Sequence, residues 1–409
     1  MRVCFLTSTY PQRAGDSTPS FVADLAEHLV CEQGCEVHVV APGSPCAAGE
    51  ETVGGVHLHR FRYAWPADRQ RISYGWGITE NLRAHPLAHL QIPTWAAAML
   101  AKAMQWASHC DLLHAHWIEP GFIGSLAKRL CGVPMVLTVH RIRPRALMRA
   151  IYRATFSAAD LVAYNSRFTQ RAGRRMNRRG NGVVVYQGYD ARRFGVSGGA
   201  AGARERLSIP PEAPLVVGLG RLVHWKGFHV LLDAWQRVAK VCPEARLVIA
   251  GGGPEKESIE RLAARLGVES AVRLIGAVDK ADVPALLAAA DVFCNPGIVD
   301  AAGNCETLGV SVIEAMASGL PCVGSRVGGI PETIVDGKTG LLVAPNDPDA
   351  LAEALIRLLK DAGLRESMGA QGRDRAREIF SWSSIARRTR ELYERVLERH
   401  ARIAGDGIT

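Results

Sequence analysis

Aromatic residues are scarce in this sequence and make up only 6% of its 409 residues. Proteins that bind single-stranded nucleic acids stack the bases on aromatic side chains, so this scarcity disfavours that class of partner. Long apolar runs are also absent, because none reaches the length of about 18 residues that a membrane-spanning helix needs. The apolar N-terminus MRVCFL is too short for a signal peptide and predicts a first buried strand.

Cysteines are present but lack the spacing of a metal site. The ten cysteines include no C-x-x-C pair, and Cys31 and Cys35 are four residues apart. Others, such as Cys4, Cys294 and Cys322, lie in apolar runs, where a free cysteine acts as a small hydrophobic residue. A disulfide framework is unusual in a chain of this length. We therefore expect reduced thiols and a reducing, cytoplasmic compartment.

Charge is abundant but unevenly divided along the chain. Residues 1–200 contain 23 Lys and Arg against 13 Asp and Glu, whereas residues 201–409 contain 26 against 27. Thirteen arginines and only two acids, Asp160 and Asp190, fall within 141–193. One interpretation is a solvated helical surface. The other is attraction to an anionic partner such as a membrane surface, a phosphorylated acceptor or nucleic acid.

Short apolar runs alternate with helix-length patterns along most of the chain. This alternation predicts an α/β protein with two doubly wound domains that face each other across a cleft. The Gly-, Ala- and Pro-rich segment 191–213 lacks periodicity and is interpreted as a linker. We expect domains at 1–190 and 214–380, and a C-terminal helix over about 381–400 that packs back on the first domain. The expected strands cover residues 3–8, 36–42, 56–62, 111–116, 135–140, 160–166, 182–188, 215–220, 245–253, 272–276, 290–296, 321–325 and 340–345.

The segment ETLGVSVIE (306–314) has a carboxylate at each end and no ionisable residue between them. Its pattern predicts a helix that begins just after Glu306 and ends at Gly319. Eight helical residues rise about 12 Å, which exceeds the separation of about 5–9.5 Å between paired glycosidase carboxylates. The spacing favours one elongated ligand held at both ends, with an anionic group at the backbone N–H groups of 307–310. A nucleotide sugar fits this description; the alternative is that Glu314 only faces solvent.

The segment GLGRLVHWKG (218–227) follows the first expected strand of the second half and places Arg221 and Lys226 in the turn. Basic side chains and glycines after a strand are typical of a phosphate site. The segment matches neither a dinucleotide fingerprint nor a Walker loop, because the required glycine and lysine spacings are missing. It therefore predicts two cations that face the phosphates of the ligand.

These segments together resemble the second domain of the retaining GT-B glycosyltransferases of family four. The similarity is carried by GRLVHWKG, GGGPE (251–255), ADVFCNPG and CETLGVSVIEAMASGLPCVGSRVGGIPE, which contains a Glu-x7-Glu element. The first half is similar too, through TSTYPQRAGD, HAHW (114–117), TVH (138–140) and VVYQGYD. The resemblance covers nearly the whole chain and is strongest over 215–345.

The resemblance implies a role for each matching residue. Arg221 and Lys226 would neutralise the donor diphosphate, and Glu306 would bind hydroxyls of the donor sugar. His140 would lie beside the reacting sugar, and these four residues form the expected catalytic set. The other expected donor contacts are Gly15, Val278, Thr307, Leu308, Gly309, Val310 and Glu314, and the expected acceptor contacts are Asp16 and His116.

Three positions depart from the family's pattern. Thr307 stands where glycine is common, and a β-branched residue narrows the backbone options there. After His140 comes RIRPR, where many relatives have small residues, and the first loop contains AGD rather than a Gly-Gly pair. The second departure bears on how the acceptor is bound.

Two other groups of residues could be read as metal ligands. Asp347-Pro348-Asp349 has the Asp-x-Asp form of metal-dependent transferases, but Asp and Pro are ordinary residues at a helix start. His114 and His116 share one face of a strand end, and the alternatives for them are packing or hydrogen bonds to the acceptor. With Arg and Lys facing the phosphates, no divalent ion is required. We expect no metal and no cofactor beyond the nucleotide sugar as co-substrate.

Together with these residues, the resemblance implies a retaining, metal-independent hexosyltransferase. It would use a UDP- or GDP-sugar and a hydroxyl acceptor in the synthesis of a glycolipid, a polysaccharide or another glycoconjugate. The alternatives are a sugar-nucleotide epimerase or phosphorylase with the same fold, and a non-catalytic protein that binds anionic surfaces. The last would account for the arginines but not for Glu306, Glu314, Arg221 and Lys226 together.

The expected partners are a nucleotide sugar, an acceptor that is a sugar, a lipid-linked molecule or a small molecule, and an anionic membrane surface; nucleic acid is not expected. The arginine-rich segments 141–153 and 167–179 are expected to be helices. The helix over 92–107 is mostly apolar and is either core or, together with the arginines, a peripheral contact with the inner face of the membrane. Its large side chains are Trp95, Met99 and Trp106.

Overall fold

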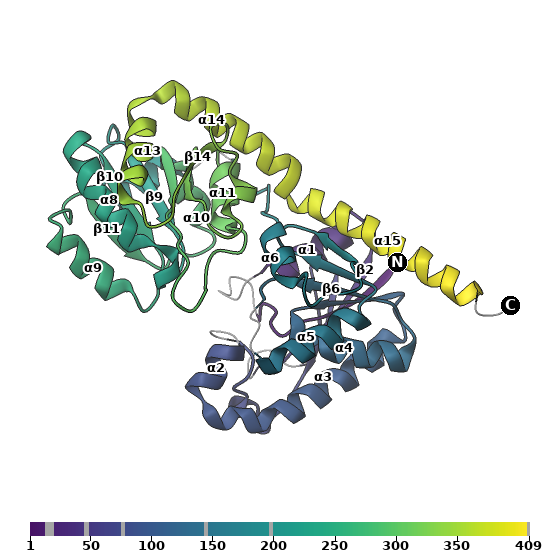
Figure 1. Cartoon of the computed structure of the whole chain (residues 1–409). Coiled ribbons are helices and arrows are strands. Elements are labelled where there is room, and N and C mark those ends of the chain that lie inside the picture. Colours follow the sequence, from purple (N-terminus) through teal and green to yellow (C-terminus); the bar gives the residue numbers. More distant parts are fainter. Residues whose placement is uncertain (13–19, 45–48, 75–77, 143–145, 196–198, 407–409) are drawn as a thin grey trace. The chain divides into compact units, whose positions relative to one another are not determined.

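The computed structural model describes residues 1–12, 20–44, 49–74, 78–142, 146–195 and 199–406. The chain forms two compact units (Figure 1): the first unit comprises Met1–Gln187 with Trp382–Thr409, and the second unit comprises Gly188–Ser381. The chain therefore passes between the units twice, after Gln187 and after Ser381.

The first unit is built on an eight-stranded sheet with the strand order β3-β4-β2-β1-β5-β6-β7-β8. Neighbouring strands are parallel, except for the antiparallel pair β3 and β4. The strands are β1 (Arg2–Leu6), β2 (Glu36–Pro42), β3 (Gly49–Val53), β4 (Val56–Phe61), β5 (Leu112–His116), β6 (Met135–Val139), β7 (Leu161–Tyr164) and β8 (Gly182–Val184). The helices are α1 (Phe21–Cys31), α2 (Ile78–Ala84), α3 (Ile92–Ala107), α4 (Ile118–Cys131), α5 (Ala146–Ala158), α6 (Arg167–Gly173) and α15 (Trp382–Asp406), with the 3₁₀ segments η1 (Ala67–Arg69) and η2 (Pro86–Gln91).

Apolar layers cover both faces of this sheet, which is why its central strands are mostly apolar. Leu113 of β5 belongs to one layer, in which it packs with Met99 of α3. Val37 of β2 belongs to the other layer, with Leu29 of α1 and Tyr393 of α15. The C-terminal helix α15 also packs on α1, so it forms part of the core of the first unit.

The second unit is built on a six-stranded, wholly parallel sheet with the order β11-β10-β9-β12-β13-β14. Its strands are β9 (Leu215–Leu219), β10 (Arg246–Ala250), β11 (Val272–Gly276), β12 (Val292–Asn295), β13 (Cys322–Ser325) and β14 (Gly340–Val343). Its helices are α7 (Ala200–Arg206), α8 (Phe228–Val241), α9 (Lys256–Arg265), α10 (Val283–Ala288), α11 (Val310–Ala317), α12 (Ile330–Thr333), α13 (Pro348–Lys360) and α14 (Ala362–Arg375), with the 3₁₀ turn η3 (His224–Lys226) and the π-helical turn η4 (Ala376–Phe380). Helix α7 lies within the segment 191–213.

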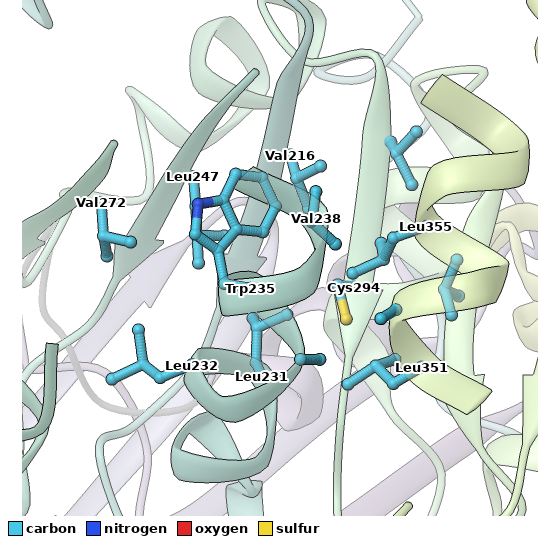
Figure 2. Packing of buried hydrophobic residues seen from close by; sticks show 14 of the residues in the cluster. Val216, Leu231, Leu232, Trp235, Val238, Leu247, Val272, Cys294, Leu351 and Leu355 are labelled. Carbon is cyan, nitrogen blue, oxygen red and sulfur yellow. The ribbon is translucent and has the colours of Figure 1, made fainter. Parts of the chain in front are cut away.

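The core of the second unit lies between its sheet and helices α8 and α13 (Figure 2). Leu231 and Trp235 of α8 are one helical turn apart, so they point to the same side, toward Leu247 of β10. Leu355 of α13 is fully buried in the same cluster. This packing holds the strands whose ends carry the candidate site.

The predicted alternation of strands and helices is confirmed in both units. The sequence did not predict β3, because all five residues of this edge strand are exposed and form no apolar run. The prediction that a helix begins just after Glu306 is wrong, since α11 begins at Val310. Gly309 before it has a φ of +89°, a conformation that a right-handed helix does not contain.

The apolar helix predicted over 92–107 is α3, and its large side chains belong mainly to the core. Trp95 and Met99 are buried, and Trp106 stacks on His59 with 3.6 Å between the ring centroids. The interpretation that Trp95 and Met99 contact a membrane is therefore wrong, because both are buried in the core. None of the described helices is long and apolar enough to cross a membrane.

The arginine-rich helix predicted over 167–179 is shorter than expected, because α6 ends at Gly173. Met176 and Asn177 follow it and are buried, and Asn177 donates a hydrogen bond to the Tyr164 hydroxyl at 3.3 Å. These contacts turn the chain back toward the sheet and end the helix. The residues 143–145 of the other arginine-rich segment lie outside the described residues.

Truncation of Leu355 tests the core of the second unit. We expect Leu355→Ala to reduce the free energy of unfolding by about 2–5 kcal/mol, because it leaves a cavity between α13 and the sheet. Urea unfolding followed by tryptophan fluorescence measures this, since Trp235 lies in the same cluster. The exposed Val241→Ala is the control and should change stability by less than about 0.5 kcal/mol; equal effects of the two variants would contradict the packing.

Candidate functional site

The position of the site in the second unit follows from the strand order. Strands β9 and β12 are neighbours, yet the chain continues from β9 to β10 on one side and from β12 to β13 on the other. The connections that leave the carboxyl ends of these two strands therefore diverge, and open parallel sheets bind ligands at this point. The loop after β9 contains Arg221 and Lys226, and the connection after β12 contains Glu306.

Lys226 and Glu306 form an ion pair that joins these two connections. The ammonium group of Lys226 donates to Oε2 of Glu306, 80 residues further along the chain. Both side chains are only 12% exposed. Lys226 Nζ also lies 5.1 Å from the centre of the Trp225 ring, where the face of an indole attracts a cation. Two residues predicted to bind one ligand are therefore in contact with each other.

Glycines set the backbone around this pair. Gly227 has a φ of +71°, and a Cβ at this position would overlap the carbonyl oxygen of Pro296. A Cβ at Gly328 would overlap the carbonyl oxygen of Glu306, to which Gly329 N donates at 3.0 Å. No side chain fits at Gly227 or Gly328, so each connection is held by direct contact between backbones.

Arg221 is the other predicted cation, and it is exposed. Its guanidinium forms no ion pair or hydrogen bond with any residue that the structure describes. The backbone beside it is fixed, because Leu222 N donates to Gly252 O at 2.9 Å. Arg221 is therefore an exposed cation beside a fixed backbone, and its five N–H groups are open to a ligand.

The start of α11 lies between the two glutamates. Thr307 and Leu308 form a bend, and Gly309 caps the helix that begins at Val310. Leu308 is buried, so this residue can reach a ligand only through its backbone. Glu314 follows in the second turn of the helix and is half-buried.

Ser311 is a residue at this site that the sequence reasoning missed. It is the second residue of α11, and its hydroxyl oxygen is buried without a hydrogen-bond partner among the described residues. A buried hydroxyl is costly unless a ligand or water satisfies it. The signal in the sequence was the single hydroxyl between the apolar residues Val310 and Val312.

Val278 is half-buried in the segment that follows β11. Gly251 N donates to Gly276 O at 2.6 Å, which ties the ends of β10 and β11 together. Since all strands of this sheet are parallel, Val278 lies at the same edge as Arg221 and Lys226.

In the first unit, His116 and His140 lie at the ends of the neighbouring strands β5 and β6. Their rings are stacked, with Nδ1 of His116 at 3.4 Å from Nε2 of His140. Phe21 and Trp117 pack against the ring of His140, each with 4.6 Å between centroids. Both histidines are buried and line a cavity of the first unit.

Gln187, which the sequence reasoning also missed, fixes the orientation of His140. Its amide Nε2 donates to Nδ1 of His140 at 3.1 Å, so the proton of the neutral ring is on Nε2, toward His116. His116 then has its own proton on Nε2, and that nitrogen is buried without a partner among the described residues. Gln187 is the last residue of the first unit before the chain leaves it.

Burial keeps these imidazoles neutral. It lowers the pKa of His140 to about 3 and the pKa of His116 well below the ordinary range. His114 is also buried, and its pKa falls to about 3. Its Nδ1 pairs with the Tyr393 hydroxyl at 2.5 Å and its Nε2 with the Thr138 hydroxyl at 2.6 Å. Neutral imidazoles can hydrogen-bond with a ligand but supply no charge.

The remaining predicted residues take no part in a described site. Gly15 and Asp16 lie outside the described residues. Asp347 caps α13, because its Oδ1 accepts from Ala350 N at 2.9 Å, and the capping interpretation is confirmed. Asp349 pairs with Arg237 at 3.5 Å. Within the part of the chain that the structure describes, no group of three or more His, Cys, Asp and Glu side chains is suited to a metal ion.

Comparisons with known proteins found two matching family models. A family model described as "Glycosyltransferase Family 4" matches residues 19–193, and one described as "Glycosyl transferases group 1" matches residues 202–375. The chain is similar to a D-inositol 3-phosphate glycosyltransferase of Streptomyces avermitilis, with 31% identity over 77% of this chain and 73% of that protein. It is also similar to a GDP-mannose-dependent alpha-(1-6)-phosphatidylinositol monomannoside mannosyltransferase of Mycolicibacterium smegmatis. The identity is 35%, over 66% of this chain and 72% of that protein.

Among solved structures, the Anabaena protein HepE in complex with UDP-glucose has a similar fold. The TM-score is 0.71 and the identity 21%, over 96% of this chain and 99% of that one. At this identity the likeness concerns the fold alone. Together with the two parallel-sheet units it shows the GT-B fold.

The buried histidines make the first unit sensitive to acid. Below pH 6.5, His114 and His140 become protonated in the unfolded chain but stay neutral in the folded state, where their pKa is about 3. The free energy of unfolding therefore falls as the pH falls from 6.5 toward 3. At pH 5 each contributes about 2 kcal/mol of destabilisation relative to neutral pH. Urea unfolding at pH 7.5 and pH 5 measures this, and His140→Gln should reduce the difference by one histidine's share. An unchanged difference in that variant would contradict the assignment.

Proposed function

Because the chain belongs to the family 4, group 1 glycosyltransferases, we propose that it transfers a hexosyl group from a UDP- or GDP-sugar to a hydroxyl of an acceptor, with retention at the anomeric carbon. The names of its relatives support a nucleotide-sugar donor, since one of them uses GDP-mannose. The structure with a similar fold that contains UDP-glucose supports the same class of donor.

The observation that carries this proposal is the Lys226–Glu306 ion pair at the ends of β9 and β12. A nucleotide sugar has a diphosphate bonded directly to a sugar, so its site needs a cation and a hydroxyl acceptor side by side. Lys226 would use its remaining N–H groups on the diphosphate, with Arg221 as the second cation. Glu306 would accept hydrogen bonds from hydroxyls of the sugar.

The rest of the donor would extend along α11. The backbone from Thr307 to Val310 would hold the distal phosphate, because a helix start presents N–H groups to anions. Glu314 would bind the ribose hydroxyls, and the main chain of Val278 would contact the base. The unpartnered hydroxyl of Ser311 supports a polar ligand at this helix start.

The proposed reaction needs positive charge more than acid or base groups. The bond between the anomeric carbon and the diphosphate oxygen breaks while the acceptor oxygen attacks on the same face, and the departing diphosphate takes the acceptor's proton. Arg221 and Lys226 would stabilise the charge that grows on the leaving group, so no metal ion or other cofactor is invoked. His140 and His116 would orient sugar or acceptor as neutral partners, together with Gly15 and Asp16.

The acceptor is proposed to be a hydroxyl of a sugar or a lipid-linked molecule in glycoconjugate synthesis. A relative that acts on phosphatidylinositol monomannoside supports a lipid-linked acceptor. The excess of arginine in 141–193 supports a peripheral position at the inner face of an anionic membrane.

Removal of the Lys226 ammonium tests the phosphate contact. We expect Lys226→Ala to lower turnover by about 10²–10³, the scale of a lost donor to a charged transition state. Release of UDP or GDP from the sugar nucleotide that stabilises the protein best in a thermal-shift panel measures it. Lys256→Ala, on the same unit and paired with Glu260, is the control. If the Lys226 variant kept more than half of its activity, the assignment would fail.

Replacement of each glutamate separates their roles. Glu314→Gln should raise the donor KM with little change in kcat, since the ribose is bound equally in ground and transition states. Glu306→Gln should lower kcat, because it orients the reacting sugar. It should also bind free UDP at least as tightly as the wild type, since Lys226 is then no longer neutralised. Weaker UDP binding by Glu306→Gln would count against this division of roles.

A further inference from the structure

Large apolar side chains are exposed in one stretch of the first unit. Trp65 is 79% exposed, Leu87 80%, Leu90 77% and Ile92 40%. Single exposed apolar residues are ordinary in soluble proteins, but a group of them marks a surface that something covers. The last three lie on η2 and the first residue of α3, and we call them the leucine ridge.

The geometry of η2 explains why the ridge points outward. Side chains three residues apart eclipse each other in a 3₁₀ helix, so Leu87 and Leu90 share one side. Ala88 and Gln91 share another side, which faces inward. Ala88 is buried, and Gln91 accepts from Arg71 N at 3.1 Å and donates to Arg69 O at 2.9 Å. The inward side anchors η2 and holds the leucines away from the core.

The exposed face of α3 extends the ridge without interruption by charge. Its exposed residues after Ile92 are mostly apolar and include two uncharged polar ones: Pro93, Thr94, Ala97, Ala101, Met104 and Gln105. The one ionisable residue of α3 is Lys102, and its Nζ donates to Glu50 Oε1 at 3.1 Å. An apolar surface of this kind is unusual on a helix that only faces water.

Positive charge surrounds the ridge. Arg69 and Arg71 are exposed on the segment that Gln91 binds, and Arg83 is exposed at the end of α2, on which η2 packs. The sequence contains no acidic residue from 81 to 110. The acids that precede this range are Asp68 and Glu80. The complement of this surface is therefore apolar at its centre and anionic at its rim.

We propose that the leucine ridge docks the first unit on an anionic phospholipid membrane. The leucines enter the boundary of the acyl chains, and the arginines bind lipid phosphates. A bilayer fits better than a protein partner, because a protruding ridge needs no partner of matching shape. The docking surface would bring the enzyme to a lipid-linked acceptor, and this role alone rests on the proposed function.

Vesicle sedimentation tests the proposal with the full chain. The wild type should bind vesicles of equal parts phosphatidylcholine and phosphatidylglycerol, and bind phosphatidylcholine alone much more weakly. Leu87→Gln/Leu90→Gln should raise the half-saturating lipid concentration about tenfold or more. Added salt should weaken wild-type binding, because it screens the arginines.

Two control variants test whether vesicle binding depends on the ridge itself. One removes exposed apolar side chains elsewhere on the same unit, and the other removes arginines elsewhere on it. Leu130→Gln/Ile403→Gln removes two side chains of the same unit that are each 64% exposed, and it should bind vesicles like the wild type. Arg387→Gln/Arg395→Gln removes two exposed arginines of α15 in the same unit and should weaken binding less than the ridge variant does. The proposal is overturned if the wild type does not bind anionic vesicles, if the ridge variant binds like the wild type, or if either control loses as much as the ridge variant.

Two further measurements separate membrane docking from dimerisation and from a defect at the donor site. If light scattering shows a wild-type dimer that the ridge variant dissociates, a second copy covers the ridge and the membrane proposal fails. Thermal stabilisation by UDP and by GDP, measured without vesicles, reports on the donor site alone. We expect the ridge variant to lose vesicle binding and to keep the nucleotide binding of the wild type. A wild type that binds vesicles but neither nucleotide would contradict the proposed function and not the docking surface.

Discussion

The candidate donor site depends on backbone segments that approach each other more closely than any side chain allows. Gly227 lies against the carbonyl of Pro296, and Gly328 lies against the carbonyl of Glu306. The first contact joins the connections after β9 and β12, and the second holds Glu306 against the segment after β13, so together they keep Lys226 and Glu306 paired across 80 residues of sequence. The chemistry of the site is therefore positioned by backbone, and the charged side chains have little freedom left.

The two units differ in their electrostatics. In the second unit Lys226 and Glu306 form an ion pair without net charge. An anionic ligand that contacts Lys226 would compete with Glu306 for the ammonium group. In the first unit His114, His116 and His140 are neutral because burial depresses the pKa of each. One unit thus offers charge to a ligand, and the other offers hydrogen bonds in an apolar setting.

Unsatisfied polar atoms mark both sites. Ser311 Oγ and His116 Nε2 are buried and lack a partner among the described residues. Such atoms reduce stability, so Ser311 at the start of α11 and His116 at the end of β5 agree with sites where a ligand or water completes the hydrogen bonds. The leucine ridge likewise reduces stability in water, because the 3₁₀ geometry that buries Ala88 exposes the apolar side chains of Leu87 and Leu90 to solvent.

The sequence by itself determined the two α/β units and suggested most residues of the candidate donor site. Apolar runs and their period are local properties, and the Glu306–Glu314 and Arg221–Lys226 patterns each lie within one short segment. Only the tertiary structure decided that Lys226 pairs with Glu306, that α11 begins at Val310, and that Trp95 and Met99 face the core while Leu87 and Leu90 face out. These outcomes depend on which segments the sheet order brings together and which side of a helix finds a partner, and no local pattern contains that information.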